Sequence, residues 1–501
     1  MKYISTRSKI EPINSANAIL QGLSSDGGLF VPEEIPQVNL KEIEKLIPMK
    51  YSQRAAVILQ KFLTDYTEFE LHECAELAYD LFDIQSKVPL AILLNKDMKN
   101  SPTGVMELWH GPTSAFKDMA LQILPRLMSL ALKKVGETKN ILILVATSGD
   151  TGKAALAGFA DVPQTKIMVF YPDGGVSKIQ RLQMVTQTGN NVNVTAVRGN
   201  FDDTQTGVKK IFSDEKIREE LSNLNVKLSS ANSINWGRLA PQIVYYFSSY
   251  AEMIKSKQIK LGDKVNVVVP TGNFGNILAA YYAKRMGLPI KTLICASNKN
   301  HVLTDFFQTG IYNRNRFFYK TITPSMDILI SSNLERLLYH ETDGDIERVK
   351  NFMNDLNSKG KYQVDDDLKK RLDKIFYADY ATEEETAETI KNTFNEFKYL
   401  VDTHTAVALS VAEKYRKKTK DMLPMILAST ASPFKFTNSV LNAVGESAEI
   451  LDDFAQLDRL SFISKNRIPK NLASLKTAEI LHENVCDKEK MADEVLEFVK
   501  K

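Results

Sequence analysis

The sequence predicts an α/β protein whose parallel, twisted sheets are flanked by helices. From about residue 88, short apolar runs alternate with segments of helical periodicity, which is the pattern of a parallel sheet covered on both faces. The clearest runs are Asn140–Ala146 and Val265–Pro270, whose largely unbroken apolar character is typical of buried parallel strands. Ligands of such folds bind beyond the carboxyl ends of the strands, so motifs at strand ends are candidate site residues.

Composition excludes several classes of function. The chain has 501 residues, of which 44% are hydrophobic and 25% charged, as in ordinary globular proteins. Its 64 Lys and Arg residues nearly balance 61 Asp and Glu residues, so a net charge of +3 favours neither nucleic acid nor an acidic membrane as a partner. No apolar run reaches the roughly 20 residues of a membrane helix, and the N-terminus does not resemble a secretory signal.

The three cysteines, Cys74, Cys295 and Cys486, are scattered along the chain. This spacing argues against a disulfide framework and against a zinc site, and it fits a reducing compartment. We therefore expect a cytoplasmic protein without a metal. The sequence does not determine the oligomeric state, for which we expect a monomer or a weak homodimer.

The chain divides into four predicted parts. Residues 1–98 form a mostly helical N-terminal accessory domain, in which the turn-rich stretch Gly22–Pro32 predicts a hairpin or tight loop. Residues 99–130 and 205–445 form the large domain, with a charged, solvated helical insertion at about 335–400. Residues 131–204 form a small mobile α/β subdomain, and residues 446–501 form a C-terminal helical segment.

Within the α/β region each element follows from periodicity and from Gly or Pro punctuation. The predicted strands are at Val105–Trp109, Asn140–Ala146, Lys166–Tyr171, Asn191–Val197, Val265–Pro270 and Met425–Leu427. The predicted helices begin after Thr113 or Ser114 and at about Gly152, and span Ser177–Thr188, Thr204–Leu221, Trp236–Lys257 and the stretch after Gly275 up to about Met286.

The stretch Glu107–Asp118 has the layout of a reactive-lysine site. His110-Gly111-Pro112 ends a strand, and Thr113 or Ser114 is placed to cap a helix whose first turn holds Lys117. The positive end of a helix and nearby aromatic groups favour a neutral amine, which a carbonyl cofactor needs in a Schiff-base partner. On spacing alone, a solvated surface lysine is the more frequent case.

Thr271-Gly272-Asn273-Phe274-Gly275-Asn276 joins the Val265–Pro270 strand to the next helix. Its glycines let the backbone approach an anion, and the N–H groups at the helix start are suited to a phosphate. The motif is neither a dinucleotide-binding fingerprint nor a Walker loop, so nucleotide binding is not favoured. The alternative is an ordinary strand-to-helix turn.

Two further loops follow predicted strands. Ser148, Gly149, Asp150 and Thr151 lie at a helix start and are suited to a carboxylate, although the same residues serve equally well as helix caps. Ser429 and Thr430 follow the strand at Met425–Leu427, where a hydroxyl could meet a ring nitrogen, although on spacing alone an ordinary Ser/Thr loop is the more frequent case.

Other single residues carry less weight. The pair Asp202-Asp203 is suited to capping a helix rather than to a metal, because no further ligands lie nearby. His110 and His404 are isolated histidines, which more often have a structural role.

Taken together in this order, the motifs resemble those of threonine synthases, which are fold-type II (tryptophan-synthase-β-like) pyridoxal phosphate enzymes. The similarity extends along the whole chain, and its most specific stretches surround Lys117 and Pro324–Ile328. It includes 26–32, 110–118, 148–152, 199–203, 232–236, 272–276 and 324–328.

The resemblance implies roles for particular residues. Lys117 would hold pyridoxal 5'-phosphate as a Schiff base and move protons on the substrate. Gly272, Asn273, Phe274, Gly275 and Asn276 would hold the cofactor phosphate, and Thr430 would face its pyridine nitrogen. Ser148, Gly149, Asp150 and Thr151 would take the substrate carboxylate. Asn235 and Arg238 are weaker candidates for binding the substrate or its phosphate.

The implied reaction converts O-phospho-L-homoserine and water to L-threonine and phosphate. A phospho-lyase that releases 2-oxobutyrate would share every motif, and a catalytically silent cofactor-binding protein is the alternative of another class. Three positions depart from the family pattern, namely Gly175, where arginine is common, Thr403, where proline is usual, and Ser432, where histidine is frequent. None of them is Lys117 or a residue of the phosphate loop.

Overall fold

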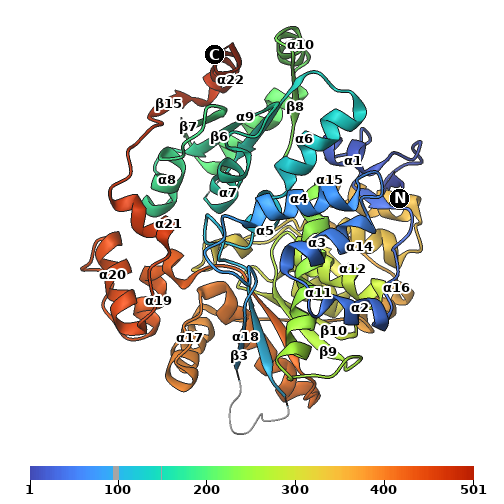
Figure 1. Cartoon of the computed structure of the whole chain (residues 1–501), viewed down its shortest axis with the longest axis vertical. Coiled ribbons are helices and arrows are strands. Elements are labelled where there is room, and N and C mark those ends of the chain that lie inside the picture. The colour runs from blue at the N-terminus through green and yellow to red at the C-terminus, as the bar shows by residue number, and fades with distance from the viewer. Residues whose placement is uncertain (94–100, 148, 501) are drawn as a thin grey trace.

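The computed structural model describes residues 1–93, 101–147 and 149–500. Two sheets dominate it, one in the lower half of Figure 1 and one in the upper half. The lower sheet has six strands in the order β13-β10-β9-β14-β4-β3, and the upper sheet has five in the order β15-β7-β6-β5-β8. Helices flank both sheets, which confirms the predicted α/β class.

The six-stranded sheet is parallel except for the antiparallel pair β3 and β4. Its strands are β3 (Leu90–Leu93), β4 (Thr103–Glu107), β9 (Val265–Pro270), β10 (Ile290–Ser297), β13 (Phe376–Tyr380) and β14 (Met425–Ser429). Because β9, β14 and β4 are neighbours and parallel, the loops that leave their carboxyl ends start at one edge of the sheet. The predicted strand through Trp109 ends earlier, at Glu107, before His110-Gly111-Pro112.

The five-stranded sheet is parallel throughout. Its strands are β5 (Asn140–Ala146), β6 (Thr165–Pro172), β7 (Val192–Arg198), β8 (Val226–Ser229) and β15 (Asn484–Asp487). The range 131–204 predicted for the small subdomain contains only β5, β6 and β7, so this sheet extends beyond it. The strand β15 buries Cys486 alone, which is too weak a pattern to distinguish it from a loop in sequence.

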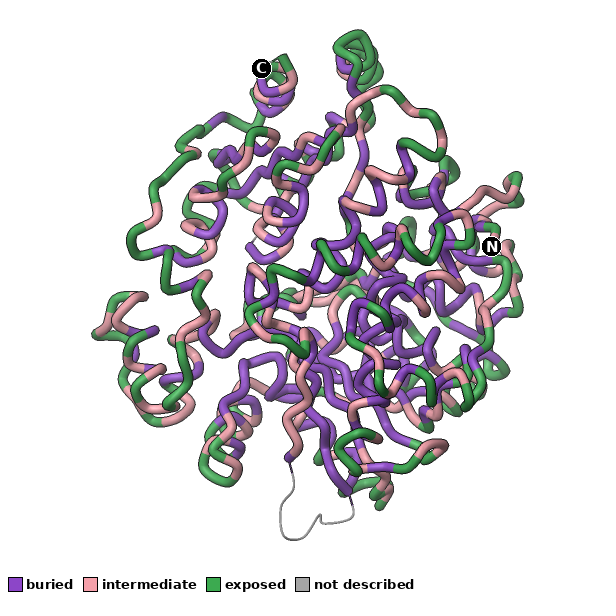
Figure 2. The backbone as a smooth tube through the Cα atoms, in the orientation of Figure 1, coloured by how far each residue is buried: buried purple, intermediate pink, exposed green. Residues whose placement is uncertain are grey.

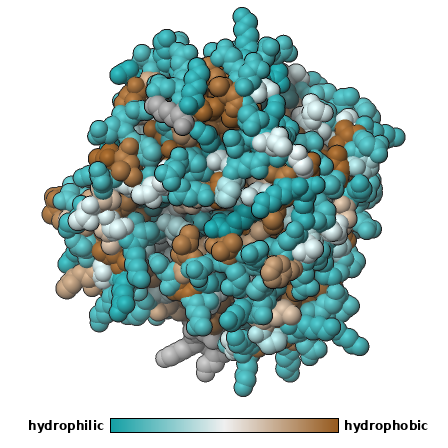
Figure 3. Space-filling view, turned by 45° about the horizontal axis from the view of Figure 1, so that its top comes forward, coloured by the Kyte–Doolittle hydropathy of each residue, from teal (hydrophilic) through white to brown (hydrophobic). Residues whose placement is uncertain are grey.

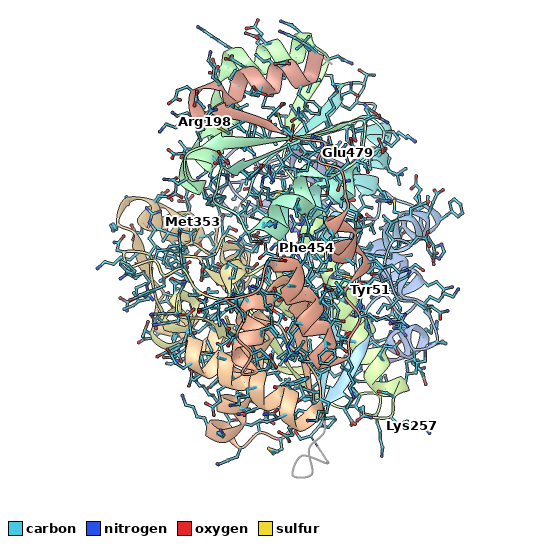
Figure 4. All side chains as sticks on the ribbon, turned by 90° about the vertical axis from the view of Figure 1, so that its left-hand side faces the viewer. Tyr51, Arg198, Lys257, Met353, Phe454 and Glu479 are labelled. Atoms are coloured by element: carbon cyan, nitrogen blue, oxygen red, sulfur yellow. The ribbon has the colours of Figure 1, made fainter. Side chains whose placement is uncertain are left out.

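We predicted that the C-terminal segment is helical. This prediction is only partly right, because the segment also contributes strand β15 to the five-stranded sheet. Its helices are α20 (Asp453–Ser464), α21 (Lys470–Ala473) and α22 (Met491–Lys500), with short 3-10 helices η4 (Ser474–Lys476) and η5 (Lys488–Lys490). Figure 4 shows the segment passing from Phe454 on α20, past Glu479, towards Arg198 on β7. Met491, Val495 and Phe498 of α22 then pack against the five-stranded sheet.

The N-terminal lobe contains α1 (Ser15–Gln21), α2 (Leu40–Leu46), α3 (Tyr51–Gln60) and α4 (Glu68–Tyr79). Its strands β1 (Tyr3–Ser5) and β2 (Phe30–Pro32) pair antiparallel with α1 between them. Of the two alternatives predicted for Gly22–Pro32, a hairpin or a tight loop, the structure has the tight loop. Gly27 N donates to the Ser24 carbonyl, and the Asp26 carboxylate accepts from Ser5 Oγ and Gly28 N. The boundary predicted at residue 98 lies outside the described residues, and β3 already belongs to the large sheet.

Helices α5 to α13 connect the strands of the two sheets. They are α5 (Asp118–Leu121), α6 (Leu124–Val135), α7 (Asp150–Phe159), α8 (Lys178–Val185), α9 (Phe201–Ser213), α10 (Glu215–Asn223), α11 (Trp236–Lys255), α12 (Gly275–Met286) and α13 (Val302–Thr309). The single helix predicted over Thr204–Leu221 is two helices. Asp214 separates them, because its side chain accepts from Lys216 N and Ile217 N and so caps α10.

The segment predicted as a solvated insertion at 335–400 is partly built into the core. Its strand β13 forms one edge of the six-stranded sheet, and the buried Arg336 guanidinium donates to the carbonyls of Phe30 and Ile234. Its helices carry many charged residues, so the few buried apolar residues along one face of each helix were not recognised in the sequence. The remaining elements are β11 (Ile311–Asn313), η2 (Pro324–Met326), α14 (Leu334–Glu341), α15 (Ile346–Ser358), β12 (Lys361–Gln363), α16 (Asp366–Asp373), α17 (Glu383–Phe397), α18 (Thr403–Thr419), η3 (Pro433–Lys435) and α19 (Thr437–Ala443).

Buried residues concentrate in the sheets and in α11, as Figure 2 shows, whereas the face drawn in Figure 3 is mostly hydrophilic with separate hydrophobic patches. Among the described residues, no helix is long and apolar enough to cross a membrane. Across the same described ranges, no group of three or more His, Cys, Asp or Glu side chains is arranged to hold a metal ion.

Candidate active site

The loops that leave β4 and β14 are joined by hydrogen bonds. Phe116 N donates to the Thr430 carbonyl at 2.8 Å, and Ser432 N donates to the Ser114 carbonyl at 3.0 Å. The neighbouring strand β9 leads into the loop at 272–276. The structure therefore brings Lys117, Thr430 and the 272–276 loop to one edge of the six-stranded sheet.

Lys117 occupies a different helical position from the one we predicted. It lies at the N-cap of the short helix α5 rather than in a first turn capped by Thr113 or Ser114. Thr113 instead donates from its backbone N and its Oγ1 to the Asp118 carboxylate, at 2.8 and 2.7 Å. Ser114 has a positive φ of 57°, so the chain turns sharply here before the lysine.

The surroundings of Lys117 favour its neutral amine. Its side chain is 15% exposed, and burial is the main cause that lowers its pKa. Lys435 and Arg238 lower the pKa further, whereas Asp150, whose Oδ2 lies 3.9 Å from the Lys117 Nζ, raises it. The net direction is downward, which suits a lysine that must both take and release protons.

An ion pair spans the two sheets next to this lysine. Lys435 Nζ, on η3, lies 2.6 Å from Asp150 Oδ1 and donates to the Thr113 carbonyl at 2.9 Å. The Lys435 and Asp150 side chains are only 1% and 5% exposed. Burial raises the pKa of Asp150, but Lys435 and Lys117 outweigh it and hold that pKa well below its usual range. Asp150 belongs to α7, so the pair links the five-stranded sheet's helices to the Lys117 loop.

Hydrogen bonds to backbone N–H groups and the conformation of Gly149 fix the loop before α7. Thr147 Oγ1 accepts from Gly149 N and Gly152 N, each at 3.0 Å. Gly149 has a φ of 151°, and a Cβ there would lie 2.4 Å from Gln180 Nε2. Thr151 is half-buried in the first turn of α7, while Ser148 lies outside the described residues. The described part of this loop presents a helix N-terminus, which is suited to a carboxylate.

The loop at 272–276 is held rigidly by neutral hydrogen bonds. Gly272 O accepts from Ser331 Oγ at 2.8 Å, and Asn273 O accepts from Asn333 Nδ2 at 3.1 Å. A Cβ on Gly272 would lie 2.7 Å from the Ser325 carbonyl oxygen, so this close approach requires glycine. Phe274, at the N-cap of α12, takes a left-handed φ of 64° and turns the chain into the helix.

This loop fits a phosphate group. Leu278 N donates to Phe274 O and forms the first backbone hydrogen bond of α12. The N–H groups that precede it in the first turn therefore have no acceptor within the helix. The buried Nδ2 of Asn276 has no hydrogen-bond partner among the described residues. Tyr245 Oη donates to Asn276 Oδ1 at 2.7 Å and fixes the amide, leaving its Nδ2 as a free donor. An anion with several acceptor oxygens would satisfy these donors.

Asn235 and Arg238 lie at the start of α11 and differ in what they offer. Asn235 caps α11 through Gly237 N at 2.8 Å and donates to the Ile19 carbonyl at 2.9 Å, so its amide is used within the protein. Arg238 donates from Nη1 to Ala231 O at 2.6 Å, but its buried Nε has no partner among the described residues. Burial lowers its pKa to about 10, which still leaves a cation at neutral pH. Arg238 is therefore the better placed of the two to bind an anion.

Three residues near Lys117 were not predicted, namely Lys435, Asp118 and Lys153. Burial lowers the pKa of Lys153 to about 8, and it donates to Gln187 Oε1 at 2.6 Å. Burial raises the pKa of Asp118 to about 6. Lys435 lies only five positions after Thr430, and this proximity was the one feature of the sequence that could have marked Lys435 as a site residue. Together with Arg238, these lysines place more cations than carboxylates around the site.

Comparison with family models matches three consecutive parts of the chain. Residues 2–79 match "Threonine synthase N terminus", residues 105–352 match "Pyridoxal-phosphate dependent enzyme", and residues 405–492 match "Threonine synthase, C-terminal". The second range contains Lys117 and the 272–276 loop, and the third contains Thr430 and Lys435.

Similar proteins extend over most of the chain. "Threonine synthase-like 1" of Homo sapiens is 40% identical over 86% of this chain, which spans 58% of that protein's length. Threonine synthase of Saccharomyces cerevisiae is 36% identical over 95% of this chain and 98% of its own. The solved structure of PLP-bound threonine synthase from Brucella melitensis is 35% identical, with a TM-score of 0.88 over 100% of this chain and 99% of that one. The chain thus belongs to the threonine synthase family of pyridoxal-phosphate-dependent enzymes.

Proposed function

We propose that this enzyme converts O-phospho-L-homoserine and water to L-threonine and phosphate. The observation that carries the proposal is the position of Lys117 at the edge of the six-stranded sheet where the 272–276 loop also starts, with Lys435 and Arg238 near enough to lower its pKa. Such a site suits a substrate that carries both a carboxylate and a phosphate. The names of the relatives, which include both threonine synthase and threonine synthase-like proteins, support the family but leave the product to be tested.

Pyridoxal phosphate, when bound, supplies an electron sink that makes the substrate's carbon-bound protons removable. In our proposal Gly272, Asn273, Phe274, Gly275 and Asn276 hold its phosphate through first-turn N–H groups and the Asn276 amide. Thr430 faces its pyridine nitrogen.

Lys117 carries the proton transfers in this proposal. Its Nζ would hold the cofactor, and as a free amine it takes the proton from the substrate Cα. A proton also leaves Cβ as the phosphate leaves Cγ, and Cγ is then protonated. Water adds at Cβ, and the same Nζ returns a proton to Cα. Burial is the main cause that lowers the pKa of Lys117, and a shift in this direction supports the role of a proton acceptor.

Two anion sites recognise the substrate in this proposal. The carboxylate lies at the N-terminus of α7, against Ser148, Gly149, Asp150 and Thr151, where backbone N–H groups favour negative charge. The phosphate is bound by Arg238, whose buried Nε is free to donate. We do not retain Asn235 as a direct contact, since its amide is occupied, and assign it the support of α11 instead.

We further propose that Asp150 and Lys435 position the substrate side of the site. Asp150 moves with the five-stranded sheet, so pairing with Lys435 sets the distance between that sheet's helices and Lys117. The mobile unit is then the whole five-stranded sheet with its helices, rather than residues 131–204 alone. We also place the protein in the cytoplasm, because Cys74, Cys295 and Cys486 are free and buried.

Product analysis by NMR tests the proposal. The purified protein with pyridoxal phosphate and O-phospho-L-homoserine should release threonine and phosphate in equal amounts. Phosphate with 2-oxobutyrate would replace the synthase with a phospho-lyase while keeping the role of Lys117. Bound cofactor without any phosphate release would contradict the substrate assignment and favour the catalytically silent alternative.

A further inference from the structure

A cavity of about 720 Å³ lies between the N-terminal lobe and the five-stranded sheet, and Lys117 is not among the residues that line it. Its walls come from the end of α1 with the residues that follow (Gln21–Leu23), from α9 and α10, from β8, and from the connector at 229–235 that leads into α11. A volume of this size accommodates a small metabolite. No role in the proposed reaction uses it.

The charged side chains around this cavity are mostly positive. Lys139, Lys209, Arg218 and Lys227 line it, against the single carboxylate of Glu137. Glu137 lies 3.7 Å from Lys227 Nζ, while Lys139 Nζ donates to the neutral Ser222 Oγ at 2.6 Å. The cavity therefore has an excess of positive charge that a bound anion would neutralise.

Apolar side chains form the rest of the lining. Phe212, Leu228 and Ile234 contribute to it, and Leu23 is 40% exposed at its edge. An exposed leucine beside a cationic cavity suits a ligand that has an apolar body as well as an anionic group.

The connector that lines this cavity also holds the active-site arginine. Ser229 Oγ donates to the Leu20 carbonyl at 2.9 Å, which ties the connector to α1. At its other end, Ala231 O accepts from Arg238 Nη1 at 2.6 Å, and Asn235 caps the helix that carries Arg238. A ligand that bridges α1 and β8 would therefore act on the position of Arg238.

We propose that this cavity binds a small amphipathic anion, a carboxylate or phosphate ester with an apolar body, and that its occupancy changes substrate binding through the 229–235 connector. The binding site stands on the cavity and its charges. The coupling to substrate rests on the function proposed above, so the two parts have separate tests.

The binding test uses 8-anilinonaphthalene-1-sulfonate as the probe, with the cofactor-loaded enzyme so that the phosphate loop is filled. We expect a saturable site whose dissociation constant rises about fivefold in the variant Lys139→Gln/Lys227→Gln, since two cations are removed. The matched control is Lys417→Gln/Lys490→Gln, which removes two exposed cations outside the cavity lining. Equal affinity in all three proteins would overturn the site.

The coupling test measures steady-state kinetics with O-phospho-L-homoserine at saturating probe. We expect KM to change by about threefold or more with a smaller change in kcat, and we expect the effect to be lost in Lys139→Gln/Lys227→Gln. A change of KM that persists in this variant would mean that the probe acts at the active site and would overturn the coupling. If no turnover of the substrate occurs at all, the proposed function fails, while the binding result stands on its own.

Discussion

The loops at residues 272–276 and 149–152 both lead from a parallel strand into a helix, yet the protein holds them in different ways. The first lies within the unit of the six-stranded sheet and is fixed by neutral hydrogen bonds from Ser331, Asn333 and Tyr245. The second belongs to the other sheet and reaches Lys117 through the charge of Asp150.

In the function proposed above, this difference would separate a preformed cofactor side from a charge-dependent substrate side. Neutral hydrogen bonds within one packed unit change little with pH, whereas a buried ion pair between two units depends on both partners staying charged. We expect changes at the first loop to alter cofactor affinity, and changes at Asp150 or Lys435 to alter pH dependence and substrate binding.

The largest effect is expected from Lys117→Ala, because this residue serves both sides. Turnover should fall by at least about 10³-fold, as one amine carries the proton transfers. Visible absorbance of the bound cofactor, before and after treatment with hydroxylamine, should show that covalent attachment is lost. Lys153→Met is the matched control, since Lys153 is also largely buried near the site, and it should keep the attachment. Full turnover by Lys117→Ala would refute the assignment.

Removing either partner of the ion pair between Asp150 and Lys435 should shift the pKa of Lys117, and the two removals should shift it in opposite directions. Lys435→Met removes a cation and frees Asp150 to face Lys117, and both changes raise the pKa of Lys117. The acid limb of kcat should then move to higher pH, because the amine of Lys117 is free only after the substrate has bound and must be deprotonated to act. Asp150→Asn removes the charge that raises this pKa, so the limb should move to lower pH.

The control for this pair is a double-mutant cycle followed by thermal unfolding. Each single variant leaves a buried charge uncompensated, which costs on the order of 3 kcal/mol, and the double variant should recover part of that loss. Shifts of both pH limbs in the same direction would show that Asp150 and Lys435 act on folding alone rather than on Lys117.

The contrast between the two loops also explains what could be predicted from sequence. Gly272–Asn276 and Lys117 lie in contiguous motifs at strand ends, so the local pattern was enough to predict them as site residues, and their roles stay predictions. Lys435 could not be predicted, because its ion-pair partner Asp150 is distant in sequence and lies on α7, a helix next to the other sheet. The same holds for β8 and β15, which are short and acquire their identity only through pairing with β5 and β7.

Helix capping was mispredicted where tertiary contacts decide it. Thr113 has the residue type of an N-cap, but it bonds to the Asp118 side chain, and Lys117 takes the cap position instead. Asn235 has the residue type of a substrate contact, yet the Ile19 carbonyl on α1 occupies its amide. In both cases a local sequence pattern does not indicate the hydrogen-bond partner that the side chain takes in the fold.

Gly272→Ala tests the rigidity of the cofactor side. The added Cβ would lie 2.7 Å from the Ser325 carbonyl, and overpacking of this kind costs about 1–3 kcal/mol. We expect roughly tenfold weaker binding of pyridoxal phosphate and a less stable cofactor-free protein, measured by fluorescence titration and thermal unfolding.

Gly275→Ala is the matched variant for this loop. Its Cβ would meet only side-chain nitrogens at 3.6 Å, an ordinary contact, so the cofactor-free protein should keep its stability. If Gly275→Ala nevertheless weakens cofactor binding, the phosphate lies against this residue. Unchanged affinity in both variants would contradict the phosphate assignment.

The smallest effect is expected from Asp118→Asn, which removes the carboxyl group that follows Lys117 and accepts hydrogen bonds from Thr113. Burial raises the pKa of Asp118 from 3.8 to about 6, so the folded protein favours the protonated acid. The stability that this group contributes is fully present below pH 3.8 and is lost as the pH rises through 6. Asparagine keeps the shape and an acceptor for Thr113 N but cannot ionise. The difference in melting temperature between variant and parent holoenzyme should therefore rise by about 3 °C between pH 4 and pH 7. Parallel curves would show that Asp118 is charged throughout this range and would contradict its raised pKa.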